Sequence, residues 1–225
     1  VVFVGQPAEE RVGGAIAMIE DGLFERFPLP DYNLALHVGA DVAGKVGITP
    51  GYALANVDTV DITVYGIGGH GSTPHLTKDP VVIASQIIVA LQTIVSREIS
   101  PQEPGVITVG SFHAGLKHNI ISDRAELKLT VRSYSDETRA KLLEGIKRIS
   151  ENMGRVAGLP EDSLPKVHFR EEEHAPATYN DPDLTLRMEK VLTAAIGEDL
   201  VARRPAVMGA EDFSHFSRTE HKIPS

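Results

Sequence analysis

The chain has 225 residues and a formal net charge of −9, because 31 acidic residues outnumber 22 lysines and arginines. This balance argues against general binding to nucleic acid or to an anionic membrane surface, which needs a basic face. The absence of cysteine excludes a disulfide scaffold, a Cys-ligated zinc finger and a thiol nucleophile within these residues. Nine histidines remain available for acid–base or metal chemistry. We find no apolar run that approaches the roughly 18–20 residues needed to span a bilayer.

The first fifty residues predict a strand, a helix and a second strand. Val1–Val4 and Leu34–Val38 are short apolar runs typical of buried strands. Between them, apolar residues repeat at helical spacing: Ala15, Met18, Ile19 and Leu23. A βαβ unit predicts a parallel sheet, in which ligands bind beyond the carboxyl ends of the strands. Glu9, Glu10 and His37 lie at or just past such ends.

A different pattern runs from about residue 55 to 175. Strands are predicted around 60–64, 106–109, 125–131 and 167–169, and those at 60–64 and 125–131 have one polar face. Helices are predicted to begin after Asp79 and Ser135. The order β-α-β-β-α-β is the ferredoxin-like pattern, so we expect an inserted domain over residues 55–175. From about Tyr179 a helical pattern returns and leads to Met208–Phe213. We therefore expect the first domain to comprise residues 1–54 and 176–225.

The two ends lack the features of complete termini. The chain does not begin with Met, and it stops at Lys222–Ser225 without a closing helix or a polar tail. We expect the 225 residues to be an internal piece of a longer protein. We expect the residues that would carry a targeting signal to lie outside these 225, so the compartment stays open, with the cytoplasm as a guess.

Glu9 and Glu10 form the first candidate site. Acidic residues are common in the first turn of a helix, where the helix dipole favours them, so a structural role is the default for this pair. Their place directly after a buried strand favours chemistry instead. On an irregular loop, one carboxylate can ligate a metal while its neighbour takes a proton from metal-bound water.

His37 closes the second apolar run. A lone histidine in that place is more often a hydrogen-bonded core residue, but imidazole is also the commonest zinc ligand. Strand ends that present Glu and His side by side would form half of a metal site.

The region 55–175 holds the remaining candidates. Gly66–His75 is rich in glycine, which usually marks only a turn, but glycines also bring backbone close to a ligand, so His70 can donate to an anionic oxygen. Asn119 lies on a loop beside His118, and Arg132 lies on the polar face of a strand, where a solvated charge is the default. Together, Asn119 and Arg132 suit recognition of a carboxylate. Signatures of a serine nucleophile, an HExxH zinc site and a dinucleotide loop are absent.

These segments together resemble the zinc-dependent aminoacylase and carboxypeptidase superfamily of metallopeptidases, and within it the amidohydrolase branch that includes hippurate hydrolase. The resemblance covers essentially the whole chain. It rests on Val1–Gly14, Leu36–Val38, Gly68–His75, His118–Ile121, Val131–Ser135 and Gly209–Phe213. It implies a partial α/β/α catalytic domain of zinc-peptidase type with an inserted ferredoxin-like dimerisation or lid domain.

The resemblance also implies a role for each candidate. Glu9 matches the general base, Glu10 and His37 match metal ligands, and His70 matches the histidine that stabilises the oxyanion, which reaches across a dimer in several relatives. Asn119 and Arg132 match positions that bind the substrate carboxylate. Glu211 lies in a segment typical of the family and is not assigned as a ligand. Further ligands, a Cys and a His upstream and a His downstream, are expected outside these residues.

The implied activity is metal-dependent hydrolysis of the amide bond of N-acyl amino acids by metal-activated water, with one or two divalent ions (Zn, Mn, Co or Ni). We expect the isolated piece to be inactive, and the protein to form a homodimer through the inserted domain without nucleic-acid or membrane partners. Two alternatives stay open. One is a dipeptidase or carboxypeptidase of the same superfamily, and the other is a non-catalytic dimerisation or binding module without a full metal site.

Overall fold

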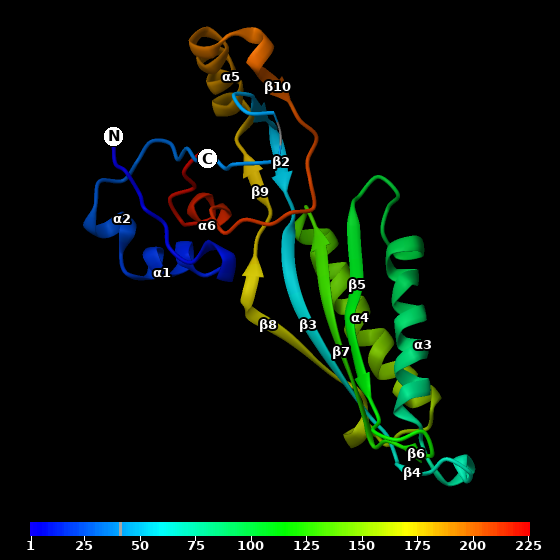
Figure 1. Cartoon of the computed structure of the whole chain (residues 1–225). Helices are drawn as coiled ribbons and strands as arrows, with labels where there is room; N and C mark the ends of the chain where they lie inside the picture. Colours follow the sequence, from blue (N-terminus) through cyan, green and yellow to red (C-terminus); the bar gives the residue numbers. More distant parts are fainter. Residues whose placement is uncertain (41) are drawn as a thin grey trace. The chain divides into compact units, whose positions relative to one another are not determined.

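The computed structural model describes residues 1–40 and 42–225, which divide into two compact units. Unit 1 comprises Val1–Val57 and Glu172–Ser225, and unit 2 comprises Asp58–Glu171. Figure 1 shows the elements of both, coloured along the sequence.

Unit 2 is built on a four-stranded sheet in the order β5-β7-β3-β8. Its strands are β3 (Asn56–Tyr65), β5 (Gly105–Ala114), β7 (Arg124–Ser133) and β8 (Lys166–Ala175). Helix α3 (Pro80–Thr93) lies between β3 and β5 in the chain, and α4 (Asp136–Val156) lies between β7 and β8 (Figure 1). The strands and helices predicted between residues 55 and 175 are therefore present in the predicted order.

Local capping explains where the two helices of unit 2 begin. The Asp79 carboxylate accepts a hydrogen bond from the Val81 backbone N–H at 2.9 Å, and Pro80 occupies the first helical position. The Ser135 hydroxyl accepts one from the Thr138 N–H at 3.1 Å. Both caps satisfy backbone donors that the first turn leaves without a helical partner. The predicted start of each helix is confirmed.

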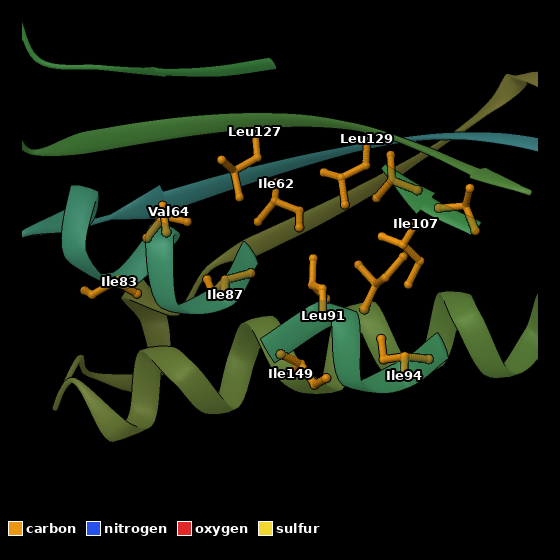
Figure 2. Close-up of a cluster of buried hydrophobic side chains, with 14 of the residues drawn as sticks. Ile62, Val64, Ile83, Ile87, Leu91, Ile94, Ile107, Leu127, Leu129 and Ile149 are labelled. Carbon is orange, nitrogen blue, oxygen red and sulfur yellow. The ribbon is translucent and has the colours of Figure 1, made fainter. Parts of the chain in front are cut away.

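Alternating side chains of the sheet and one stripe of each helix form the core of unit 2. Figure 2 shows Ile62, Leu127 and Ile107 pointing from the strands toward the helices. From the other side α3 contributes Ile83, Ile87 and Leu91, followed by Ile94 and, from α4, by Ile149. Burial of this apolar surface stabilises the unit at about 25 cal/mol per Å². The opposite sheet face carries polar side chains such as Glu126 and Lys128, which explains the alternation in the sequence.

One helix corrects the expectation that no apolar run approaches membrane-spanning length. Pro80–Glu98, which is α3 and the single π-helical turn after it, has 19 residues and is apolar enough, by length and composition alone, to cross a bilayer. Its residues Ile83, Ala84, Ile87 and Leu91 pack in the core of unit 2. The high hydropathy of this helix therefore has a structural explanation within the unit.

Unit 1 contains short strands and four helices among the described residues. Strand β1 (Val46–Ile48) pairs in parallel with β10 (Val201–Arg203), and β2 (Gly51–Leu54) pairs antiparallel with β9 (Thr178–Asn180). The helices are α1 (Gly14–Glu20), α2 (Leu23–Arg26), α5 (Pro182–Ile196) and α6 (Ser214–Ser217). Asp181 caps α5 through the Leu184 N–H at 2.8 Å, which confirms the helix predicted after Tyr179.

The N-terminal βαβ prediction is wrong for the described residues. Val1–Val4 and Leu34–Val38 form no strand, and their side chains are exposed, Phe3 at 98% and Leu36 at 85%. A strand forms only where a neighbour accepts and donates its backbone hydrogen bonds, and no described segment pairs with either run. The expected helix also ends at Glu20 and resumes at Leu23, because Gly22 adopts the left-handed region (φ 84°) between them.

Candidate functional site

Glu9 and Glu10 lie in a short 3-10 turn, Glu9–Arg11, that follows an extended N-terminal segment. The residues on both sides of the turn, Ala8 (φ 52°) and Val12 (φ 56°), adopt the left-handed region. That conformation is energetically costly for residues with a Cβ, above all for a β-branched residue such as valine. It persists only where the surrounding structure enforces it, and such residues cluster at functional sites. The Glu9 side chain is partly buried, whereas Glu10 is exposed, so the two adjacent carboxylates occupy different environments.

A buried carboxylate from the far end of the sequence holds this turn. Asp212 is fully buried and accepts hydrogen bonds from the Gln6 side-chain amide and from the Ala15 backbone N–H, the latter at 3.0 Å. These donors stand on either side of the Glu9–Arg11 turn. At Gly14, a Cβ would lie 1.5 Å from the Pro7 carbonyl oxygen, so only glycine permits this approach of helix and turn. Asp212 and Gly14 together fix the segment that carries Glu9.

Three carboxylates converge next to the turn. Oxygen atoms of Glu9, Glu211 and Asp212 all lie within 4.8 Å of one another. Burial, and then the neighbouring charge of Glu9, raise the pKa of Glu211 to about 7, although the Phe213 N–H donates to Glu211 Oε1 at 3.2 Å. Acidic groups this close cannot all ionise without repulsion, so the cluster favours either a shared proton or a cation.

His37 approaches the same cluster from an exposed segment. Its Nε2 lies 3.9 Å from Glu211 Oε2, and its Nδ1 lies 2.6 Å from the Val38 carbonyl oxygen. A carbonyl only accepts, so Nδ1 carries a proton and donates to it, and Nε2 is the ring nitrogen that faces Glu211. The expectation that His37 closes a buried strand is wrong, since its side chain is 73% exposed.

The donors of unit 1 fit a divalent metal ion by their chemistry. Imidazole nitrogen and carboxylate oxygen are the ligands that zinc, manganese, cobalt and nickel take in proteins. The structure gathers Glu9, Glu211 and His37, whereas Glu10 does not belong to the close group of carboxylates among the described residues. Sequence reasoning singled out Gly209–Phe213 without assigning it a role. The local signal in that segment is an acidic pair, Glu211 and Asp212, that follows Gly209 after one alanine.

His70 and Asn119 form a second polar centre, in unit 2. Strand β4 (Gly69–His70) pairs with β6 (Ile120–Ile121), and the Gly71 N–H donates to the Asn119 carbonyl oxygen at 2.9 Å (Figure 1). The Asn119 side-chain oxygen is buried and has no hydrogen-bond partner among the residues that the structure describes. A buried acceptor without a donor is costly, so it marks a position able to receive a ligand or a partner group.

Arg132 lies far from that centre, on β7 of the four-stranded sheet. The Gly66 N–H donates to the Asp123 carbonyl oxygen at the start of β7, whereas Arg132 lies next to the last residue of this strand. The length of β7 between them is about 25 Å at the usual rise per residue. The Arg132 guanidinium is partly buried, which lowers its pKa, and its Nε donates to Thr130 Oγ1 at 3.2 Å. Within one chain, Asn119 and Arg132 cannot bind the same carboxylate.

Comparison with known proteins gives a consistent family assignment. A family model described as peptidase family M20/M25/M40 matches residues 1–225. Hippurate hydrolase of Campylobacter jejuni is 39% identical over 94% of this chain and 54% of its own length. Thermostable carboxypeptidase 2 of Saccharolobus solfataricus is 37% identical over 95% of this chain and 52% of its own length. N-acetyldiaminopimelate deacetylase of Anoxybacillus flavithermus is 36% identical over 96% of this chain and 55% of its own. The chain thus spans about half the length of these relatives.

Solved structures show the same likeness. A structure from methicillin-resistant Staphylococcus aureus superposes with a TM-score of 0.81 and 36% identity, covering 95% of this chain and 53% of that one. The YXEP protein of Bacillus subtilis, a dinuclear metal-binding peptidase from the M20 family, superposes with a TM-score of 0.73 and 26% identity. The match covers 97% of this chain and 52% of the YXEP chain.

Proposed function

Because the chain belongs to peptidase family M20/M25/M40, we propose that it carries part of the active site of a metal-dependent amidohydrolase. The proposed substrates are N-acyl amino acids, hippurate-like, which are cleaved to a carboxylic acid and an amino acid. The likeness to hippurate hydrolase supports this substrate class. The observation that carries the proposal is the convergence of Glu9, Glu211 and His37 beside the strained Glu9–Arg11 turn.

In this proposal Glu9 is the general base, and Glu10 and His37 hold one or two divalent ions. The likeness of the chain to the YXEP protein, a dinuclear metal-binding peptidase, supports the ions, and the nitrogen and oxygen donors of these side chains suit them. A bound ion supplies Lewis-acid chemistry, lowering the pKa of a water and polarising a carbonyl. Glu9 accepts the proton of the attacking water and returns it to the leaving amine nitrogen. The assignment of Glu10 rests on the family resemblance alone.

His70 is the proposed donor to the oxyanion, and Asn119 and Arg132 are the proposed contacts to the substrate carboxylate. His70 is exposed and stands on a short paired segment, so it can donate outward. Arg132 offers a planar guanidinium suited to a carboxylate. Because His70 and Asn119 lie at one end of β7 and Arg132 at the other, we propose that two copies of the chain contribute them to one site.

We propose that unit 2 is a ferredoxin-like dimerisation or lid domain inserted into a partial catalytic domain formed by unit 1. The order β5-β7-β3-β8 with helices between β3 and β5 and between β7 and β8 supports this assignment. Strand β5 is an edge strand that can pair with its twin about a two-fold axis. An apolar groove of about 730 Å³ between α3 and α4 supports association further; it includes the exposed Val82, Val89 and Val156.

Replacement of Glu9 tests the proposed base. Glu9→Gln keeps the size of the side chain but cannot accept a proton, so we expect hydrolysis of N-benzoylglycine to fall by a factor of about 10²–10⁴ while bound metal is unchanged. Glu20→Gln, on the exposed side of α1, is the matched control and should keep full activity. Wild-type turnover by the metal-loaded Glu9→Gln protein would refute the role of Glu9.

Mixing two inactive variants tests the shared site. In a heterodimer of the two variants, the His70→Ala chain supplies Glu9 and the Glu9→Gln chain supplies His70. If His70 acts in the site of the partner, one of the two sites then contains both intact residues, so activity reappears on mixing. If His70 serves its own chain, every site keeps one defect and the mixture stays inactive. Sedimentation of the wild-type protein provides the independent control, because a monodisperse monomer contradicts the arrangement.

The 37% identity to a thermostable carboxypeptidase favours one alternative, a carboxypeptidase or dipeptidase that uses the same residues. A panel of N-benzoyl and N-acetyl amino acids against free dipeptides separates the two substrate classes. The other alternative is a non-catalytic binding module. It predicts no activity on either class and no metal in the purified protein.

A further inference from the structure

The ring of His70 contacts Ser72 through its Nδ1 atom. Ser72 Oγ lies 2.6 Å from His70 Nδ1, and the Ser72 backbone N–H donates to the same nitrogen at 3.2 Å. We propose that Ser72 is a positioning residue that holds the His70 imidazole with its Nε2–H directed outward as a hydrogen-bond donor. The functional meaning of these two hydrogen bonds rests on the proposed role of His70 as donor to the oxyanion.

The backbone contact decides which nitrogen carries the proton. An amide N–H can only donate, so His70 Nδ1 must be the acceptor, and the proton of the neutral ring is then on Nε2. The Ser72 hydroxyl, at 2.6 Å from the same nitrogen, donates to it as well. An outward Nε2–H is the form of histidine that can stabilise a developing negative charge without first taking up a proton.

The surrounding loop keeps Ser72 at this distance. The Thr73 N–H donates to the His70 carbonyl oxygen at 2.9 Å and closes a tight turn around Ser72. The Gly71 N–H binds the Asn119 carbonyl oxygen, and a Cβ on Gly71 would lie 3.2 Å from that oxygen. Because both sides of the turn are anchored through backbone groups, exchange of the Ser72 side chain leaves the loop in place and removes only the hydroxyl.

Three variants of the full-length protein distinguish the effect of the Ser72 hydroxyl from the effect of the loop conformation. Ser72→Ala removes the hydroxyl, and Ser72→Thr keeps it. Thr73→Val is the control, because Thr73 Oγ1 contacts the His70 carbonyl oxygen at 3.2 Å and no contact joins it to the ring within the described residues. Each variant is measured by long-range proton–nitrogen NMR of the histidine side chains and by the kcat and KM for N-benzoylglycine.

We expect the wild-type His70 ring to show the Nε2–H form, and the Nδ1 signal to move in Ser72→Ala only. For Ser72→Ala we expect kcat to fall about fivefold to tenfold, as loss of one hydrogen bond predicts, with KM unchanged because the oxyanion exists only in the transition state. Ser72→Thr should restore kcat to within about twofold, and Thr73→Val should resemble the wild type.

Two results would overturn the proposal. One is an Nδ1–H ring in the wild-type protein, and the other is a Ser72→Ala protein whose His70 signals and kcat equal those of the wild type. A His70→Ala protein with full kcat would instead refute the proposed function of His70. In that case the NMR arm still decides whether Ser72 holds the ring.

Discussion

The carboxylate of Asp212 accepts a hydrogen bond from the backbone N–H of Ala15 at 3.0 Å, although 197 positions separate the two residues in the sequence. Ala15 lies in the first turn of α1, where backbone donors have no helical partner. The same carboxylate also accepts from the Gln6 side chain. Asp212 therefore holds both flanks of the turn that carries Glu9.

Asp212→Asn should destabilise unit 1. An amide offers one acceptor oxygen where the carboxylate offers two, so either Gln6 or Ala15 loses its acceptor in a buried place, and we expect a loss of about 1–3 kcal/mol in the free energy of unfolding. Denaturant unfolding gives this value, and hydrogen exchange at the Ala15 amide should accelerate. Asp31→Asn, an exposed change in the same unit, is the control. Equal stability of the two variants would contradict the role of Asp212 in holding the Glu9–Arg11 turn.

Gly14→Ala should disrupt the turn, whereas Gly13→Ala should not. At Gly14 the new Cβ would meet the Pro7 carbonyl oxygen at 1.5 Å, so helix or turn must move, at a cost of about 1–3 kcal/mol or more. At Gly13 the nearest atom, the Arg11 carbonyl oxygen, is 3.7 Å away, which is an ordinary contact. Thermal unfolding of the pair tests the prediction, and similar midpoints would contradict it.

The raised pKa of Glu211, about 7, predicts a pH dependence of the metal-free protein. Between the ordinary pKa of a glutamate and pH 7 the folded protein binds a proton that the unfolded chain releases, so stability falls as pH rises through this window. After allowance for solvent screening, the loss is of the order of 1–3 kcal/mol.

Unfolding in the presence of a chelator between pH 4.5 and 8 measures this slope, and Glu211→Gln should flatten it. Glu10→Gln, at an exposed position, should leave the slope unchanged. A slope that survives the Glu211 replacement would assign the proton to another group.

Arg139 and Arg155 each bind a carboxylate through two guanidinium nitrogens, but the burial of the two pairs differs. Arg139 binds Asp58, whose side chain is only 5% exposed, whereas Arg155 binds Glu161 in solvent. Arg139→Met removes the guanidinium that faces the buried Asp58 carboxylate and should cost about 3 kcal/mol in the free energy of unfolding. Arg155→Met should leave unfolding unchanged within error, because solvent screens an exposed pair.

The double variant Asp58→Leu with Arg139→Met is the internal control for this pair. It removes both charges and should regain most of the stability lost in the single variant. If the double variant is as unstable as Arg139→Met, lost packing rather than the lost ion pair explains the effect.

Much of unit 2 could be predicted from the sequence, since its signals are local. Asp79 and Ser135 mark helix starts through side chains that reach only two or three residues, and alternation along residues 125–131 reflects one buried face. The N-terminal prediction failed because Val1–Val4 and Leu34–Val38 have the composition of strands without a neighbour to pair with among the described residues. Composition describes a preference, whereas a strand requires a partner.

Local motifs were enough to identify the family of the chain and to nominate the candidate residues Glu9, Glu10, His37, His70, Asn119 and Arg132. Which of these residues lie close together became visible in the three-dimensional structure. It joined Glu9 and His37 through Glu211, and it separated Asn119 from Arg132 by most of a strand. The physical reason is that a hydrogen bond such as that of Asp212 to Ala15 depends on distance in space, which spacing in sequence does not encode.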